Sequence, residues 1–122
     1  MAFKTVFIAH APDADPEKHH NLIETGKYKL FTYVVKNQNE AIKVCKDLYK
    51  KENIESVLLC PGFTHKDVAE IFEALESKVA VCVSRGDGPS SKITAPVLQR
   101  EFFGKWFVGI INFIDCNRIT IV

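Results

Sequence analysis

The sequence predicts an α/β fold, a layered sandwich with a mainly parallel sheet in the order β-α-β-α-β-α-β and a C-terminal β-hairpin. Two observations support it. Short apolar runs rich in β-branched and aromatic residues alternate with segments of helical periodicity, which is typical of parallel sheets. The chain has 122 residues, of which 47% are hydrophobic and 25% are charged, and these values suit one folded domain, 1–122. We expect its core at 3–90 and a loop and hairpin at 91–122.

The first elements follow from short local patterns. The run "KTVFIAHA" predicts a buried strand from Thr5 to His10. The segment "DPEKHHNLIETG" predicts a short helix, because Asp15 suits the N-cap, Pro16 the first helical position and Gly26 the end. The run "YKLFTYVVK" then predicts a second strand, apolar on both faces.

The most strongly patterned helix comes next, in "NQNEAIKVCKDLYKKEN". Its apolar residues repeat at helical spacing, with charged residues opposite: Ala41, Ile42, Cys45, Leu48 and Tyr49. We interpret Cys45 as a structural residue of this stripe. The run "SVLLC" predicts the third strand.

A third helix is expected after the turn "CPGFTH". Thr64 and Asp67 have the spacing of a capping box, with Asp in place of the preferred Glu. The apolar stripe of this helix comprises Val68, Ile71, Phe72 and Leu75. The run "VAVCVS" predicts the fourth strand, with Cys82 in its core.

The remainder of the chain differs in character. "RGDGPSSK" predicts a flexible loop, and "TAPVLQREFF" a short helix entered through Pro96. "WFVGIINF" and "RITIV" predict two strands joined by the turn "DCN". Such a hairpin would extend the sheet edge or pair with another subunit, so we expect a homo-oligomer.

Composition excludes several classes of partner. The net charge of +1, from 16 basic and 15 acidic residues, argues against nucleic acid. The longest apolar stretch, "WFVGIINFI", is too short to span a bilayer, and the N-terminus lacks a signal-peptide pattern. The four cysteines form no C-x-x-C pair, which predicts reduced thiols in a cytoplasmic protein.

The predicted site lies where three strands end, because ligands of parallel α/β sheets bind outside the carboxyl ends of the strands. These ends are "HAPDAD", "CPGFTH" and "SRGDGPSS". The candidate ligand-binding residues are Asp13, Gly62, Phe63, Thr64, Arg85 and Asp87. The free N–H groups at the start of a helix bind anions, and an arginine adds charge, so a small anionic molecule is the expected ligand. Turn and cap chemistry alone would also explain these residues, and no nucleotide-binding glycine pattern is present.

The candidate catalytic residues are His10, His19, Cys60 and His65. Histidine titrates near neutrality and suits acid–base chemistry. A helix start and the nearby His65 would favour the thiolate of Cys60, although packing at the end of a buried strand explains this cysteine adequately. The histidine spacing matches no recognised metal motif, so no metal is predicted. The sequence identifies no cofactor.

Two motifs carry a resemblance. "APDADPEKHH" after the first strand and "LLCPGF" at the end of a later strand resemble a family of small prokaryotic α/β proteins catalogued as a domain of unknown function. The resemblance covers about residues 3 to 90 and is weaker from Ile93 to Val122. It points to the following residues: Ala11, Pro12, Ala14, Asp15, Pro16, His19, Cys60, Gly62 and Phe63. The resemblance implies the fold and the location of the site, and no activity.

Three functions therefore remain open. The first is binding of a small anionic metabolite. The second is an enzyme that uses His10 or His19 as acid or base and Cys60 as nucleophile. The third is an oligomeric scaffold whose interface is the C-terminal hairpin. We favour the binding protein, because no complete catalytic constellation can be assembled from these residues.

Overall fold

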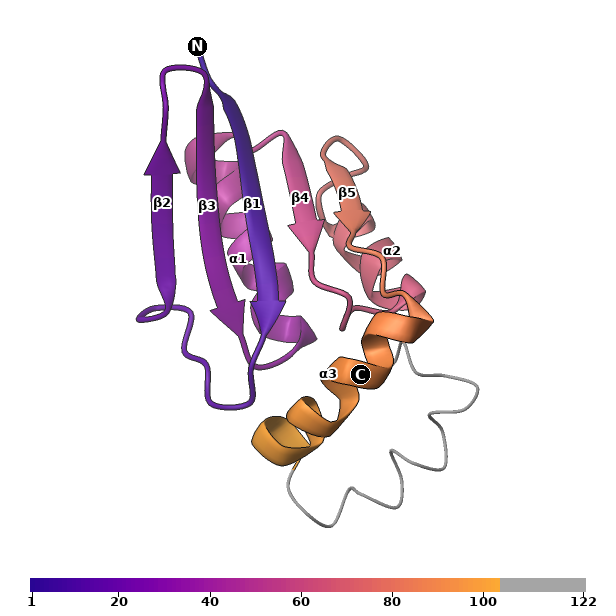
Figure 1. Ribbon diagram of the computed structural model, residues 1–122. Coiled ribbons are helices and arrows are strands. Elements are labelled where there is room, and N and C mark those ends of the chain that lie inside the picture. Colours follow the sequence, from indigo (N-terminus) through magenta and orange to yellow (C-terminus); the bar gives the residue numbers. More distant parts are fainter. Residues whose placement is uncertain (104–122) are drawn as a thin grey trace. The chain divides into compact units, whose positions relative to one another are not determined.

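The computed structural model describes residues 1–103, and the chain divides into two compact units, Met1–Ser84 and Arg85–Val122. The first unit is built on a five-stranded sheet with the order β2-β3-β1-β4-β5 (Figure 1). The elements of this unit are β1 (Phe3–His10), β2 (His20–Glu24), β3 (Tyr28–Val35), α1 (Gln38–Glu52), β4 (Ser56–Leu59), α2 (His65–Ala74) and β5 (Ala80–Val83).

The sheet is mostly parallel, which confirms the predicted α/β class. β1 pairs in parallel with β3 on one side and with β4 on the other, and β4 pairs in parallel with β5. The edge strand β2 runs antiparallel to β3. The described elements therefore begin with three consecutive strands, and the predicted order β-α-β-α-β-α-β is wrong at its first helix.

The predicted helix from Asp15 to Gly26 is a single turn followed by a strand. The carbonyl oxygen of Asp15 accepts the N–H groups of Lys18 and His19 at 2.9 and 2.7 Å. The Asp15 carboxylate also accepts the N–H of Glu17 at 3.0 Å. Asp15 thus does cap a helical turn, as the sequence predicts, but the helix does not continue beyond that turn. The following residues pair along β3 as β2, because cross-strand pairing outweighs a weak local helix preference.

The core of this unit lies between one face of the sheet and both helices. The strand register places Val6 beside Phe31 and Val57, and Ile8 beside Leu59. The helices pack onto this face with their buried residues, which are Ala41, Val44, Cys45, Leu48 and Ile71. Since side chains alternate along a strand, only one face of the sheet takes part in this core.

Both helices begin where the sequence predicts. The side chain of Asn37 accepts the N–H of Glu40 at 2.9 Å and caps α1. The capping box of α2 is confirmed: Thr64 Oγ1 accepts the Asp67 N–H at 3.1 Å, and the Asp67 carboxylate accepts the Thr64 N–H at 2.9 Å. These bonds satisfy N–H groups that have no acceptor inside a helix.

The second unit, as far as it is described, is helical. It contains α3 (Gly88–Leu98) and a π-helical turn at Gln99–Phe103. The expected loop at 85–92 is therefore wrong from Gly88 onward, because Pro89 suits the first turn of a helix. Pro96 lies inside this helix and not at its start. The predicted hairpin at 106–122 lies outside the described residues, so it and any subunit contact that it makes stay predictions.

Candidate functional site

The carboxyl ends of β1 and β4 lie side by side in the sheet, and the chain continues from them toward opposite edges of the sheet. After β1 the chain runs to β2 and β3 on one side, whereas after β4 it runs through α2 to β5 on the other (Figure 1). The N–H of Cys60 donates to the carbonyl oxygen of Ile8 at 3.0 Å and joins the two ends. In open α/β sheets, crevices for ligands form at such switch points.

Four predicted residues meet at this point, and we name them the strand-end cluster: His10, Cys60, Gly62 and Phe63. The rings of His10 and Phe63 stack with their centroids 4.0 Å apart and their planes inclined by 23°. Phe63 is only 5% exposed and belongs to the hydrophobic core. The position of His10 is therefore set by a core residue.

Gly62 lies against both chemically active side chains of the cluster. A Cβ atom at Gly62 would stand 3.2 Å from His10 Nδ1 and 3.6 Å from Cys60 Sγ. The turn is closed by the Phe63 N–H, which donates to the Cys60 carbonyl oxygen at 3.2 Å. The close approach to the His10 ring, and not a left-handed backbone, therefore favours glycine at this position.

Burial lowers the pKa of His10 below its ordinary value, and the negative charge of Asp67 opposes that shift. The ring is therefore neutral at neutral pH. A neutral imidazole has one N–H donor and one nitrogen acceptor, so His10 can bind a polar ligand or accept a proton.

Cys60 is a free, half-buried cysteine whose side chain packs against the core. Among the described residues, its thiol makes no hydrogen bond to His10 or to any other side chain. By contrast, burial raises the pKa of the Cys45 thiol to about 12, which makes that cysteine inert. Cys82 is exposed, although the sequence indicated a core position.

Helix α2 begins directly after the turn that carries Cys60, Gly62 and Phe63. Thr64 and Asp67 satisfy each other's N–H groups, as described above. The N–H groups of His65 and Lys66 have no acceptor within the helix, and both residues are exposed. Thr64 is therefore a cap first, and His65 contributes a free backbone N–H two residues after Phe63.

The remaining predicted residues have other places. Asp13 is exposed in the loop after β1. His19 Nδ1 accepts the N–H of Asp15 at 2.9 Å, so this ring closes its own turn. Arg85 and Asp87 belong to the second unit, where they form an exposed ion pair with Nε and Oδ1 2.9 Å apart.

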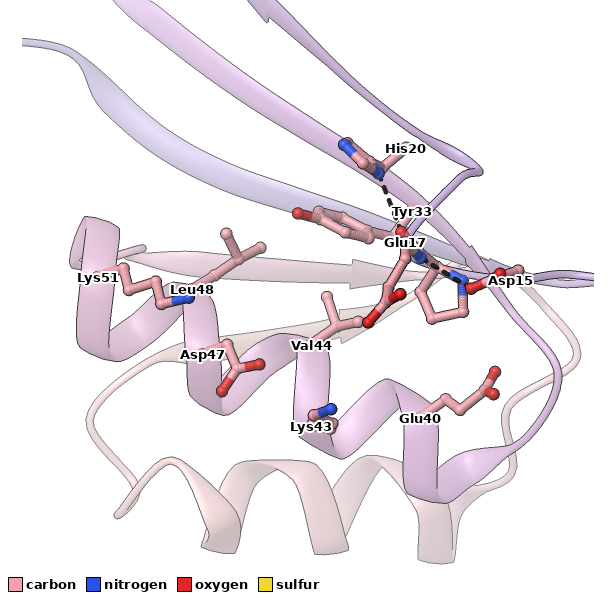
Figure 2. A pocket seen from close by; sticks show the side chains of 11 residues that line it. Asp15, Glu17, His20, Tyr33, Glu40, Lys43, Val44, Asp47, Leu48 and Lys51 are labelled. Carbon is pink, nitrogen blue, oxygen red and sulfur yellow. Dashed lines mark hydrogen bonds between the residues drawn. The ribbon is translucent and has the colours of Figure 1, made fainter.

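A cavity that the sequence did not predict lies between α1, the turn after β1, and strands β2 and β3 (Figure 2). Its volume is about 460 Å³. Its lining includes an aromatic pair, His20 and Tyr33, whose rings stack with centroids 5.1 Å apart. Val44 and Leu48 of α1 provide apolar surface, and the charged lining residues are Asp15, Glu17, Glu40, Lys43, Asp47 and Lys51.

The signal for this cavity is weak in the sequence. Lys43, Asp47 and Lys51 recur every four residues on α1, and such a charged stripe is usually a solvated helix face. Only the pairing of β2 with β3 brings His20 over Tyr33 and closes the other wall. Burial raises the pKa of Tyr33, and the charges of Asp47 and Glu52 add to that effect.

The described residues contain neither a group of metal ligands nor a membrane-spanning helix. Within 1–103, no three His, Cys, Asp or Glu side chains gather in a way that could hold a metal ion. None of the helices in that range has the length and apolar character needed to cross a membrane.

Comparison with known proteins gives one match. Residues 3–98 match a family described as a family of unknown function, DUF6506. The matched range includes β1, the strand-end cluster, the cavity and all of α3. No curated protein matches the chain, and neither does any solved structure.

Proposed function

The chain belongs to the DUF6506 family, whose function is unknown, and we propose that this member binds a small anionic ligand at its strand-end cluster. The observation that carries the proposal is the stack of His10 on Phe63 at the carboxyl ends of β1 and β4. A half-buried, neutral imidazole held rigidly at a switch point is a preorganised donor for one polar group of a ligand.

The start of α2 supports an anion as the ligand. The N–H groups of His65 and Lys66 have no helical acceptor, and the positive end of a helix favours negative charge. The Lys66 side chain adds a cation at the same turn. Asp67 carries the opposing charge, but its carboxylate is committed to the Thr64 N–H at 2.9 Å.

The proposal is tested by titrating the protein with inorganic phosphate and with malonate while amide and histidine resonances are followed by NMR. We expect saturable shifts at His10, His65 and Lys66. The pKa of His10 should rise with bound anion, since a negative ligand stabilises the imidazolium form. His10→Phe keeps an aromatic ring against Phe63 and should abolish the response.

His20→Phe is the matched control, because His20 stacks on Tyr33 in the cavity and not in the strand-end cluster. This variant should bind both anions as the unmodified protein does. Equal loss in both variants, or shifts spread evenly over the surface, would contradict the proposal.

A second candidate function is catalysis with His10 as base and Cys60 as nucleophile. It is favoured by the position of Gly62, which lies against both His10 Nδ1 and Cys60 Sγ. The test is the rate of iodoacetamide alkylation at each cysteine, resolved by peptide mass spectrometry. If the candidate is correct, half-buried Cys60 reacts faster than exposed Cys82, and His10→Phe removes the difference. A slower Cys60 in the unmodified protein would eliminate this candidate.

A further inference from the structure

We propose that the cavity between α1 and the β2–β3 edge is a second binding site, which takes a small organic cation with an apolar or aromatic body. This site is separate from the strand-end cluster and does not depend on the function proposed there. Its volume of about 460 Å³ lies within the range typical of small-molecule sites.

The apolar part of the ligand has a defined surface to occupy. Val44 and Leu48 are 8% and 7% exposed, so they already belong to the core and present fixed apolar surface to the cavity. Tyr33 lies beside them on β3, with the His20 ring stacked on it at an interplanar angle of 19° (Figure 2). An aromatic or aliphatic body can pack on this surface with little rearrangement.

The charges of the lining favour a cation. Four carboxylates line the cavity, on Asp15, Glu17, Glu40 and Asp47, against two lysines. The Glu40 carboxylate accepts the Lys36 N–H at 2.7 Å, and its other oxygen lies 3.5 Å from Lys36 Nζ. One Asp15 oxygen accepts the Glu17 N–H at 3.0 Å. Glu40 and Asp15 therefore already bind groups of the protein itself and are less available to a ligand.

Glu17 and Asp47 are the two acids available to a ligand. They come from opposite walls, the turn after β1 and helix α1 (Figure 2). Within residues 1–103, neither carboxylate has a hydrogen-bond donor or an ion-pair partner. A cationic group held between the two walls would meet both charges.

The aromatic pair supplies two further contacts. Burial raises the pKa of Tyr33, and the negative charges of Asp47 and Glu52 raise it further, so both carboxylates act on this side chain. A cation over this ring also gains a cation–π interaction. His20 Nδ1 lies 2.9 Å from the Pro16 carbonyl oxygen, and the tautomer that donates from Nδ1 leaves Nε2 as an acceptor for an ammonium N–H.

The lysines define the competing possibility. Lys43 and Lys51 stand one helical turn on either side of Asp47, and they would attract a carboxylate. A set of three probes with the same phenylethyl body therefore separates the alternatives: phenethylamine, 3-phenylpropionate and 2-phenylethanol. Each is titrated into the full chain at pH 7 and constant ionic strength, with backbone amides followed by NMR.

We expect phenethylamine to shift the amides of Glu17, His20 and Asp47 in a saturable way and to bind more tightly than the other two probes. Asp47→Asn and Glu17→Gln should each weaken this binding about threefold, the size of one exposed ion pair. Neither variant should change binding of 2-phenylethanol. Lys51→Gln should strengthen phenethylamine binding, because it removes a repelling charge.

Glu73→Gln is the matched control, since Glu73 is exposed on α2 and does not line the cavity. It removes one negative charge from the chain and should leave phenethylamine binding unchanged. The proposal is overturned if 3-phenylpropionate or 2-phenylethanol binds as tightly as the amine. The same conclusion follows if no cavity amide shifts up to the solubility limit of the amine. Loss of anion binding at His10 would not affect either result.

Discussion

The strand-end cluster and the cavity lie in the same unit of the chain but are held in different ways. In the cluster, Phe63 is 5% exposed and stacks on His10, and a Cβ atom at Gly62 would stand only 3.2 Å from His10 Nδ1. In the cavity, the acids without a partner in the described residues, Glu17 and Asp47, are exposed, and the apolar surface comes from core residues of α1. The positions of the side chains in the strand-end cluster are thus determined by core packing. The ligand preference of the cavity is determined by the charges at its surface. Substitutions of the packed residues Gly62 and Phe63 should therefore affect folding, whereas substitutions of the cavity acids should affect binding alone.

The largest effect is expected for Phe63→Ala. Removing a ring that is 95% buried leaves a cavity in the core, which costs about 3–5 kcal/mol of unfolding free energy. The same change exposes His10, whose pKa should then move up toward its ordinary value. Urea unfolding measures the first effect, and an NMR titration of the histidine ring measures the second.

Phe72→Ala provides the reference for that experiment. Phe72 lies on α2 and is 40% exposed, so its removal should cost roughly 1 kcal/mol. Equal stability of the two variants would show that Phe63 does not hold the strand-end cluster in place. It would contradict the conclusion that core packing determines this site.

Gly62→Val should have the next largest effect. Even a Cβ atom at this position stands 3.2 Å from His10 Nδ1, and valine adds two methyl groups. Overpacking of this kind costs about 1–3 kcal/mol. We expect the loss of stability together with displacement of the His10 ring, visible as shifted resonances of His10 and Phe63. Unchanged stability and an unchanged histidine spectrum would show that the turn is looser than the structure indicates.

The protonation of His10 should make stability depend on pH. Because the folded-state pKa is lowered, the ring is neutral in both states above its ordinary value of 6.5. As the pH falls below that value, the unfolded chain takes up the proton more readily, so the free energy of unfolding decreases. His10→Phe should lose less stability than the unmodified protein between pH 7.5 and pH 5 in urea unfolding. An identical decrease in both proteins would place His10 in a solvent-like environment.

The smallest effect on folding is expected for Asp47→Asn in the cavity. Asp47 is exposed and has no ion-pair partner within the described residues, so the unfolding free energy should change by less than about 0.5 kcal/mol. Its effect should appear in phenethylamine binding instead. A destabilisation as large as that of Gly62→Val would mean that the cavity wall is also part of the folding core.

The strand-end cluster was predictable because its residues obey local rules and one general rule. The capping pair Thr64 and Asp67 marks the start of α2, and an apolar run marks β4 before it. Once those elements are assigned, the carboxyl-end rule brings His10 and Cys60 together. The role of Phe63 as the support of His10 was not predictable, because a ring stack depends on how the turn folds back over β1.

The cavity was not predictable for the opposite reason. The local signals at Asp15 and Pro16 favour a helix, and they do form one helical turn. His20–Glu24 forms a strand because it hydrogen-bonds along β3. This pairing depends on the tertiary fold, and the residues next to His20–Glu24 in the sequence do not predict it. Without β2, His20 would not lie over Tyr33, and α1 would show an ordinary solvated face at Asp47.

The sequence by itself determined the α/β class, the starts of α1 and α2, and the meeting of His10 with the turn at Cys60–Phe63. These features depend on periodicity and capping, which act between residues a few positions apart. Tertiary structure alone decided that β2 is a strand and that the cavity exists. Both depend on the hydrogen bonds that join β2 to β3. The physical reason is that pairing and burial between distant segments contribute more free energy than the local preferences that they override.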